Sequence, residues 1–147
     1  MKNILYAGFK GANNSSSHVV NSLDGNKILL TNSFGGISRD IETLNSKYEK
    51  IIMYGLDKTL KDTIRFEKTA KSGHDLIYST ADLSEYISKA ERMNLNYTIS
   101  EHPTHYLCNE AYYRMMKKMD CSVLFVHIPT LKNMSTNFFE KLITVFN

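Results

Sequence analysis

Short apolar stretches alternate along this chain with segments of helical periodicity. The apolar stretches are residues 4–7, 27–31, 51–54, 97–99 and 122–126. Nearly continuous apolar stretches of this length are typical of strands that are buried on both faces of a parallel sheet. Because such strands need helices on both sides, we expect an α/β fold, a three-layer αβα sandwich of the phosphorylase/hydrolase-like type with a largely parallel, mixed sheet. Ligands of such sheets bind beyond the carboxyl ends of the strands, which here are the loops after Tyr6, Ile99 and Val126.

Five further segments carry apolar residues at the spacing of one helix face. They are residues 18–23, 37–48, 83–93, 107–119 and 138–146. We expect the polar residues 13–17 to form a loop that caps the first of these helices. Asp82 and Glu85 make a start like a capping box for the third, and Asn137 and Glu140 are placed to cap the last.

Nothing in the sequence divides the chain into separate units. Its 147 residues are about the size of one domain, and 42% of them are hydrophobic, which is enough for a core. Residues 56–78 lack a clear period, and within them we expect short strands at 63–66 and 76–78, paired with each other. We therefore expect one domain, residues 1–147.

Charge and cysteine content narrow the function. The net charge is only +3, and the basic residues are scattered, so we expect no nucleic-acid partner and no membrane partner. The turn at residues 8–14 matches neither the Gly-x-Gly-x-x-Gly pattern nor the Walker pattern, so we expect no nucleotide cofactor. We expect no other cofactor either. Two cysteines, Cys108 and Cys121, are too few for a disulfide framework and favour the reducing cytoplasm.

Cys108 is the strongest candidate for a reactive residue. It follows a loop and begins a helix, where the amide dipoles stabilise a thiolate, the form that attacks carbonyl carbon. His127 lies at the end of a strand, and Pro129 then turns the chain away. Loops at one edge of the sheet would bring imidazole and thiol together as base and nucleophile. Spacing alone leaves the alternative open that both are ordinary structural residues.

A zinc site is a second interpretation of the same region. His102, His105 and Cys108 follow one another at intervals of three residues and are zinc-ligand types. The set lacks closely spaced pairs and a clear fourth ligand, and Pro103 stiffens the loop. We therefore expect no metal.

Several segments, taken in order, resemble one known family. They are residues 8–9, 14–20, 55–56, 65–70, 104–113 and 125–129. Together they resemble pyroglutamyl peptidase I (pyrrolidone-carboxylate peptidase), a family of cytosolic cysteine exopeptidases that remove amino-terminal pyroglutamate. The cysteine of that family lies in a Tyr-x-Cys-Asn segment, matched by residues 106–109, and its histidine precedes x-Pro at a strand end, as His127 does. Its glutamate lies in an Ile-x-x-Glu-Arg-like segment, matched by residues 64–68.

The resemblance implies a catalytic triad and a substrate. Cys108 would be the nucleophile, His127 the general base and acid, and Glu67 the carboxylate that orients the imidazole. The residues expected to contact the substrate are Phe9, Asn14 and Tyr106. The partner would be a peptide with a blocked amino terminus, and relatives commonly form homo-oligomers.

The chain also departs from the family pattern and looks like a shortened member. Where the family reads Gly-Phe-x-Pro-Phe-Gly-Gly, residues 8–12 keep only the aromatic Phe9. Residues 56–60 replace a glycine-rich loop that carries an arginine, and no arginine follows between Glu67 and Leu76. We therefore expect a cysteine exopeptidase with weak or altered activity. The alternative is a non-catalytic relative that binds a small molecule or a protein.

Overall fold

A mixed sheet forms the centre of the computed structural model, which describes residues 3–45 and 47–147. The six strands follow the order β2-β1-β3-β8-β4-β7. Their bounds are β1 (Ile4–Phe9), β2 (Asn26–Leu30), β3 (Lys50–Leu56), β4 (Ile64–Glu67), β7 (Tyr97–Ser100) and β8 (Ser122–Ile128). The strands β1, β2, β3 and β8 are parallel, whereas β4 pairs antiparallel with β8 and parallel with β7. The expected α/β sandwich with a largely parallel, mixed sheet is confirmed.

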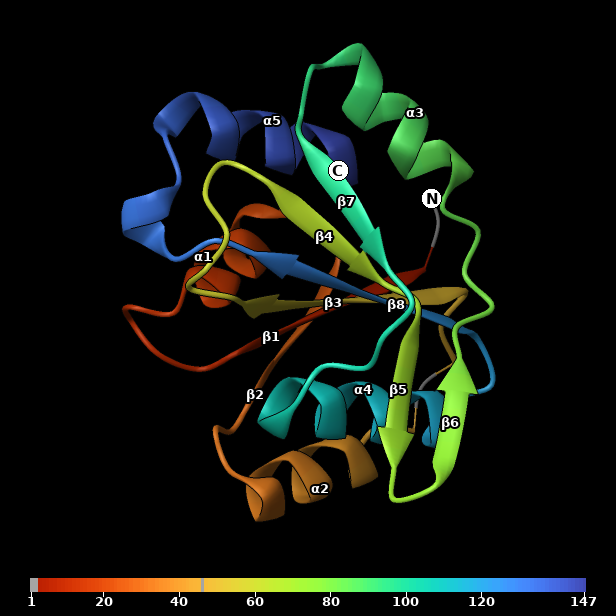
Figure 1. Cartoon of the computed structure of the whole chain (residues 1–147). Coiled ribbons are helices and arrows are strands. Elements are labelled where there is room, and N and C mark those ends of the chain that lie inside the picture. The colour runs from red at the N-terminus through yellow and green to blue at the C-terminus, as the bar shows by residue number, and fades with distance from the viewer. Residues whose placement is uncertain (1–2, 46) are drawn as a thin grey trace.

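Helices cover both faces of the sheet (Figure 1). One face carries α2 (Phe34–Glu42) and α4 (Tyr106–Lys118), and the other carries α1 (Ser15–Ser22), α3 (Ser84–Arg92) and α5 (Thr136–Phe146). A short 3-10 helix, η1 (Leu131–Asn133), precedes α5. Each face has its own cluster of buried apolar side chains, which is why most strand residues are buried on both sides. None of the helices in the described residues is long and apolar enough to cross a membrane.

The helix boundaries agree with the sequence in part. Asn14 caps α1, and its side chain accepts a hydrogen bond from the Ser16 amide, as the polar loop predicts. The prediction for α5 is wrong, because Ser135 is its N-cap and accepts from the Phe138 amide. Asn137 and Glu140 lie inside that helix.

Two other helices differ from expectation at their ends. The N-cap of α3 is Leu83, and Asp82 contributes only a turn in which it accepts from the Ser84 amide. Helix α2 ends at Glu42, so Leu44 and Tyr48 are outside it. They still pack against the same apolar cluster from the following loop, which explains why they share the helical spacing.

The region 56–78 is organised differently from the prediction. The strand β4 does not pair with residues 76–78 but enters the main sheet between β8 and β7. The hairpin is made instead by β5 (Thr69–Ser72) and β6 (Asp75–Tyr78). Ile64 and Phe66 are fully buried with the α1, α3 and α5 face, and this burial holds β4 in the sheet.

The antiparallel direction of β4 and β7 also changes how the loops meet. The carboxyl ends of β1, β3 and β8 share one edge of the sheet, because the three strands are parallel; the arrowheads of β3 and β8 point to this edge in Figure 1. β7 runs the other way, and the segment after it returns to that edge before α4 begins. The expectation that the strand before the loop after Ile99 ends at this edge is therefore wrong. The loop itself does reach this edge.

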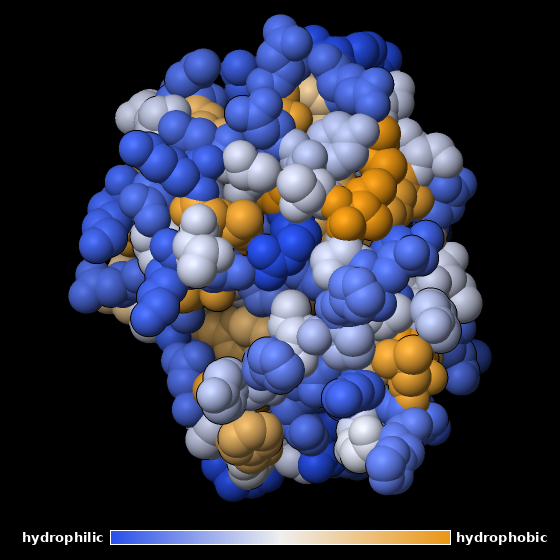
Figure 2. Space-filling model, in the orientation of Figure 1, coloured by the Kyte–Doolittle hydropathy of each residue, from blue (hydrophilic) through white to orange (hydrophobic). Residues whose placement is uncertain are grey.

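The surface seen in Figure 2 is mainly hydrophilic, with apolar residues in separate patches. The large apolar side chains that remain exposed are Phe34, Leu76, Tyr78, Ile99, Tyr106 and Leu131.

Candidate active site

A buried histidine and a buried glutamate meet on neighbouring strands. His127 lies near the end of β8, and Glu67 ends β4; the two residues are 3% and 1% exposed. His127 Nδ1 lies 2.8 Å from Glu67 Oε2. An ionised carboxylate can only accept, so Nδ1 donates this bond and Nε2 remains available as the basic nitrogen. The predicted contact between these two residues is therefore present in the geometry.

Cys108 reaches the same place from α4. It is the third residue of that helix, and its sulfur would lie only 2.7 Å from a Cβ added to Gly55. Gly55 is paired with His127 in the register of β3 and β8. Adjacent strands are about 4.8 Å apart, so the thiol lies over the backbone one strand from the imidazole. Only glycine at position 55 leaves room for this approach, since the same Cβ would also lie 2.6 Å from the Phe125 ring.

Cys108 and His127 line one cavity of about 750 Å³ at the carboxyl edge of the parallel strands. Its walls come from the turn after β1, the turn after β3, the start of β4, the loop before α4 and the end of β8. The lining residues are Phe9, Asn14, Asn32, Leu56, Asp57, Lys58, Arg65, Pro103, Thr104, His105, Tyr106, Leu107, Cys108 and His127. The cavity that Cys108 and His127 line is thus large enough for a small acyl group and part of a peptide.

The three predicted substrate contacts all line this cavity. Phe9 is 3% exposed and presents an apolar wall. The Asn14 side-chain oxygen is already used, because it accepts hydrogen bonds from the amide and the hydroxyl of Ser16. Tyr106 is 83% exposed and begins α4 with a φ of 63°, a left-handed conformation that a residue with a large side chain rarely adopts. Such local strain is common where a loop positions a functional side chain.

The electrostatics of Cys108 differ from the sequence expectation. Burial, together with the negative charges of Glu67 and Asp57, raises the pKa of the Cys108 thiol to about 12, and Arg65 offsets only part of this. The helix start was expected to favour a thiolate. Burial and the two nearby carboxylates instead favour the neutral thiol as the resting group.

Two charged residues of the site were missed by the sequence analysis. Arg65 and Asp57 line the cavity, and their side chains form an ion pair of 2.8 Å. Arg65 also donates from Nε to Glu67 Oε2. The signal was present, because polar residues at 65 and 67 alternate with buried Ile64 and Phe66, so Arg65 and Glu67 share one face of the strand.

The alternative metal site finds no support in the geometry. His105 and Cys108 line the cavity, but His102 does not. Across residues 3–45 and 47–147, no group of three or more His, Cys, Asp or Glu side chains is arranged to hold a metal ion.

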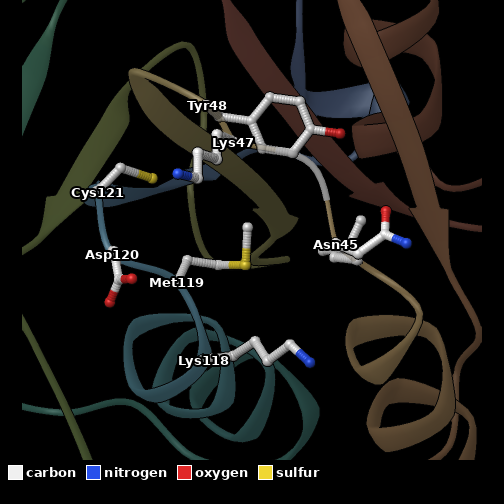
Figure 3. A pocket seen from close by; sticks show the side chains of 8 residues that line it. Asn45, Lys47, Tyr48, Lys118, Met119, Asp120 and Cys121 are labelled. Atoms are coloured by element: carbon white, nitrogen blue, oxygen red, sulfur yellow. The ribbon is translucent and has the colours of Figure 1, made fainter.

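Cys121 lies at the other edge of the sheet, just before β8. A separate cavity of about 370 Å³ opens there, lined by Leu44, Asn45, Lys47, Tyr48, Lys118, Met119, Asp120 and Cys121 (Figure 3). The length of β8 separates this cysteine from His127 by roughly 20 Å.

Comparison with known proteins identifies the fold. No family model matches the sequence, and no curated protein matches it. Among solved structures, the chain matches pyrrolidone carboxyl peptidase from Thermus thermophilus with a TM-score of 0.82 and 17% identity, over 97% of this chain and 96% of that one. It matches pyroglutamyl peptidase I from Bacillus amyloliquefaciens with a TM-score of 0.79 and 14% identity, over 98% and 92% of the two chains. It matches pyrrolidone carboxyl peptidase from Thermococcus litoralis with a TM-score of 0.71 and 19% identity, over 99% of this chain and 90% of that one.

The chain is thus an α/β protein with a cavity at the carboxyl edge of its parallel strands. More particularly, it has the fold of the pyrrolidone carboxyl peptidases over nearly its whole length. The resemblance expected from the sequence is confirmed at the level of the fold.

Proposed function

We propose that this protein is a cysteine exopeptidase that removes amino-terminal pyroglutamate, or a related small acyl group, from peptides. The observation that carries the proposal is the buried hydrogen bond between His127 and Glu67, together with the cavity that His127 and Cys108 both line. The fold shared with pyrrolidone carboxyl peptidases supports it independently.

In the proposed reaction Cys108 attacks the carbonyl carbon of the scissile amide, and His127 Nε2 takes the thiol proton. Because the pKa of Cys108 is raised to about 12, this proton leaves as the sulfur–carbon bond forms rather than beforehand. Glu67 holds the imidazole and stabilises the imidazolium that results. His127 then protonates the leaving amine, which breaks the carbon–nitrogen bond and leaves an acyl-thioester. Water, deprotonated by the same imidazole, releases the acid and restores the thiol.

The start of α4 supplies the donors for the negative oxygen of the intermediate. The first amides of a helix have no acceptor within it. Among the described residues, no side chain caps this end, since His105 makes no capping hydrogen bond. These amides therefore remain free to form an oxyanion hole beside Cys108.

Phe9, Asn14 and Tyr106 are proposed to contact the acyl group. The substrate would be a peptide whose amino terminus is blocked, with no cofactor required. A nucleophile that must stay a thiol suits a reducing compartment, so we propose the cytoplasm.

The direct test is hydrolysis of pyroglutamyl-aminocoumarin and of pyroglutamyl peptides, with the released pyroglutamate measured by mass spectrometry. We expect slow release by the unmodified protein and none by Cys108→Ser with an unchanged circular dichroism spectrum. A protein inactive on pyroglutamyl and other small amides, with an inert Cys108, would instead be the non-catalytic binding relative.

A further inference from the structure

Glu67 accepts two competing hydrogen bonds on one oxygen. His127 Nδ1 lies 2.8 Å from Oε2, and Arg65 Nε donates to the same atom at 2.5 Å. Within the described part of the chain, the other oxygen, Oε1, is buried without a hydrogen-bond partner. The Glu67 carboxylate is therefore shared between a histidine and a permanent cation. Any change in the charge or position of Arg65 changes the hydrogen bond that Glu67 can accept from His127.

Asp57 fixes Arg65 in this position. Arg65 Nη2 donates to Asp57 Oδ2 at 2.8 Å, and Asp57 Oδ1 accepts from the amide and the hydroxyl of Thr59 at 2.9 and 2.7 Å. The Asp57 amide donates to the Ile128 carbonyl, which ties the turn to the end of β8. Burial alone would raise the pKa of Asp57, but the bonds from Thr59 and Arg65 lower it to about 2, so its charge persists throughout the working range.

We propose that Arg65, held by Asp57, is a positioning residue that sets how readily the Glu67–His127 pair takes up a proton. This inference rests on the proposed function, in which His127 is the general base. Arg65 lies directly opposite His127 in the antiparallel register of β4 and β8, so no intervening side chain separates the two.

The direction of the effect follows from the charges. With His127 neutral, Glu67, Asp57 and Arg65 carry one net negative charge, which a single proton cancels. Without the Arg65 charge the cluster is more negative and binds that proton more tightly; without the Asp57 charge it is neutral and binds it less tightly. The other titratable or charged groups of the same cavity are Cys108, Lys58 and His105.

The test uses two substitutions that should act in opposite directions. In Arg65→Met, the imidazole signals of His127 should titrate roughly one pH unit higher than in the unmodified protein, and in Asp57→Asn roughly half a unit lower. Nuclear magnetic resonance of the imidazole nitrogens, assigned with His127→Gln, measures both shifts without substrate. The acidic limb of the kcat/KM profile should move the same way.

Three further comparisons separate charge from structure. Arg65→Lys keeps the positive charge, so the His127 imidazole should titrate close to its pH in the unmodified protein. If Arg65→Met fails to fold, Arg65→Gln replaces it as the variant that removes the charge. Arg114→Met removes another paired arginine, the partner of Glu110 on the outside of α4, and should move nothing. Thermal unfolding monitors the fold of each variant.

Opposite shifts for the two substitutions support the role of Arg65. Shifts in the same direction, or none in either variant, overturn it, because a merely structural role would lower activity in both without separating them. If the unmodified protein hydrolyses no pyroglutamyl substrate while the imidazole still shifts in opposite directions, the proposed function fails and the electrostatic role of Arg65 stands.

Discussion

The two cysteines occupy opposite edges of one sheet and differ in what surrounds them. Both are half-buried free thiols, and burial raises the pKa of each. Cys108 lines the same cavity as His127, and the Glu67 carboxylate is close enough to raise the pKa of its thiol, whereas the lining of the cavity at Cys121 contains no histidine (Figure 3). Under the proposed function, the difference teaches that a neighbouring base, rather than exposure or a helix start, distinguishes a reactive thiol from an ordinary one.

The largest difference in activity between the two edges of the sheet should appear when each thiol is removed in turn. Cys108→Ser should lower kcat/KM for the pyroglutamyl substrate by about 10⁴-fold or more, down to the background rate, because the nucleophile is lost. Cys121→Ser should leave it within about twofold. Steady-state assays of both variants measure this, and equal losses would place the chemistry elsewhere.

The next effect concerns the carboxylate behind the histidine. Glu67→Gln keeps the size of the side chain but not its charge, so the imidazolium loses its partner and kcat should fall by about 10³-fold. KM should change little, since Glu67 does not line the cavity. Glu110→Gln, which removes a carboxylate paired with Arg114, is the matched control and should retain full activity.

The proposed reduction of the substrate pocket should lower kcat/KM less than the loss of Cys108 or Glu67 does. One aromatic wall fewer is worth about 1–3 kcal/mol of transition-state binding, or roughly tenfold to a few hundredfold in kcat/KM. Side-by-side assays with the Thermus thermophilus enzyme on pyroglutamyl-aminocoumarin measure the ratio. Equal rates would mean that other residues, with Tyr106 and Phe34 the first to test, rebuild the wall.

The smallest effect tests the close approach of Cys108 to the sheet. A Cβ at position 55 would lie within 2.7 Å of Cys108 Sγ and 2.6 Å of the Phe125 ring, so Gly55→Ala should destabilise the fold by about 1–3 kcal/mol and displace the thiol. Gly35→Ala is the control, because its Cβ would meet only the end of Arg39 at 3.4 Å on a helix. Chemical denaturation measures both, and equal stability of the two variants would contradict this packing.

The sequence was sufficient for the elements that have a strong period. The strand β8 and the helix α4 follow from continuous or three-to-four-spaced apolar residues, and they carry His127 and Cys108. The direction and partners of β4 could not be predicted, because four residues carry little pattern and their pairing depends on distant strands. The alternation of residues 64–67 places Arg65 and Glu67 on one face of a strand, but without the pairing of β4 it does not show which residues they contact.

The raised pKa of Cys108 also could not be predicted from the sequence. A helix start is visible in the residues, but the desolvation that favours the neutral thiol depends on the side chains packed around it. This has a consequence for pH. In His127→Ala, where no base assists, the alkylation rate of Cys108 should rise about tenfold per pH unit between pH 7 and 10, because the thiolate fraction keeps rising until the pKa is reached.

Limited alkylation of both cysteines tests the proposed roles of Cys108 and His127 most directly, and it requires no knowledge of the substrate. At neutral pH with limiting iodoacetamide, peptide mass spectrometry should find Cys108 labelled before Cys121, since His127 accepts the thiol proton as sulfur attacks. His127→Ala should slow the labelling of Cys108 and leave that of Cys121 unchanged. Equal labelling of the two thiols in the unmodified protein, or labelling of Cys108 that does not respond to the loss of His127, would contradict the assignment of Cys108 and His127 as nucleophile and base.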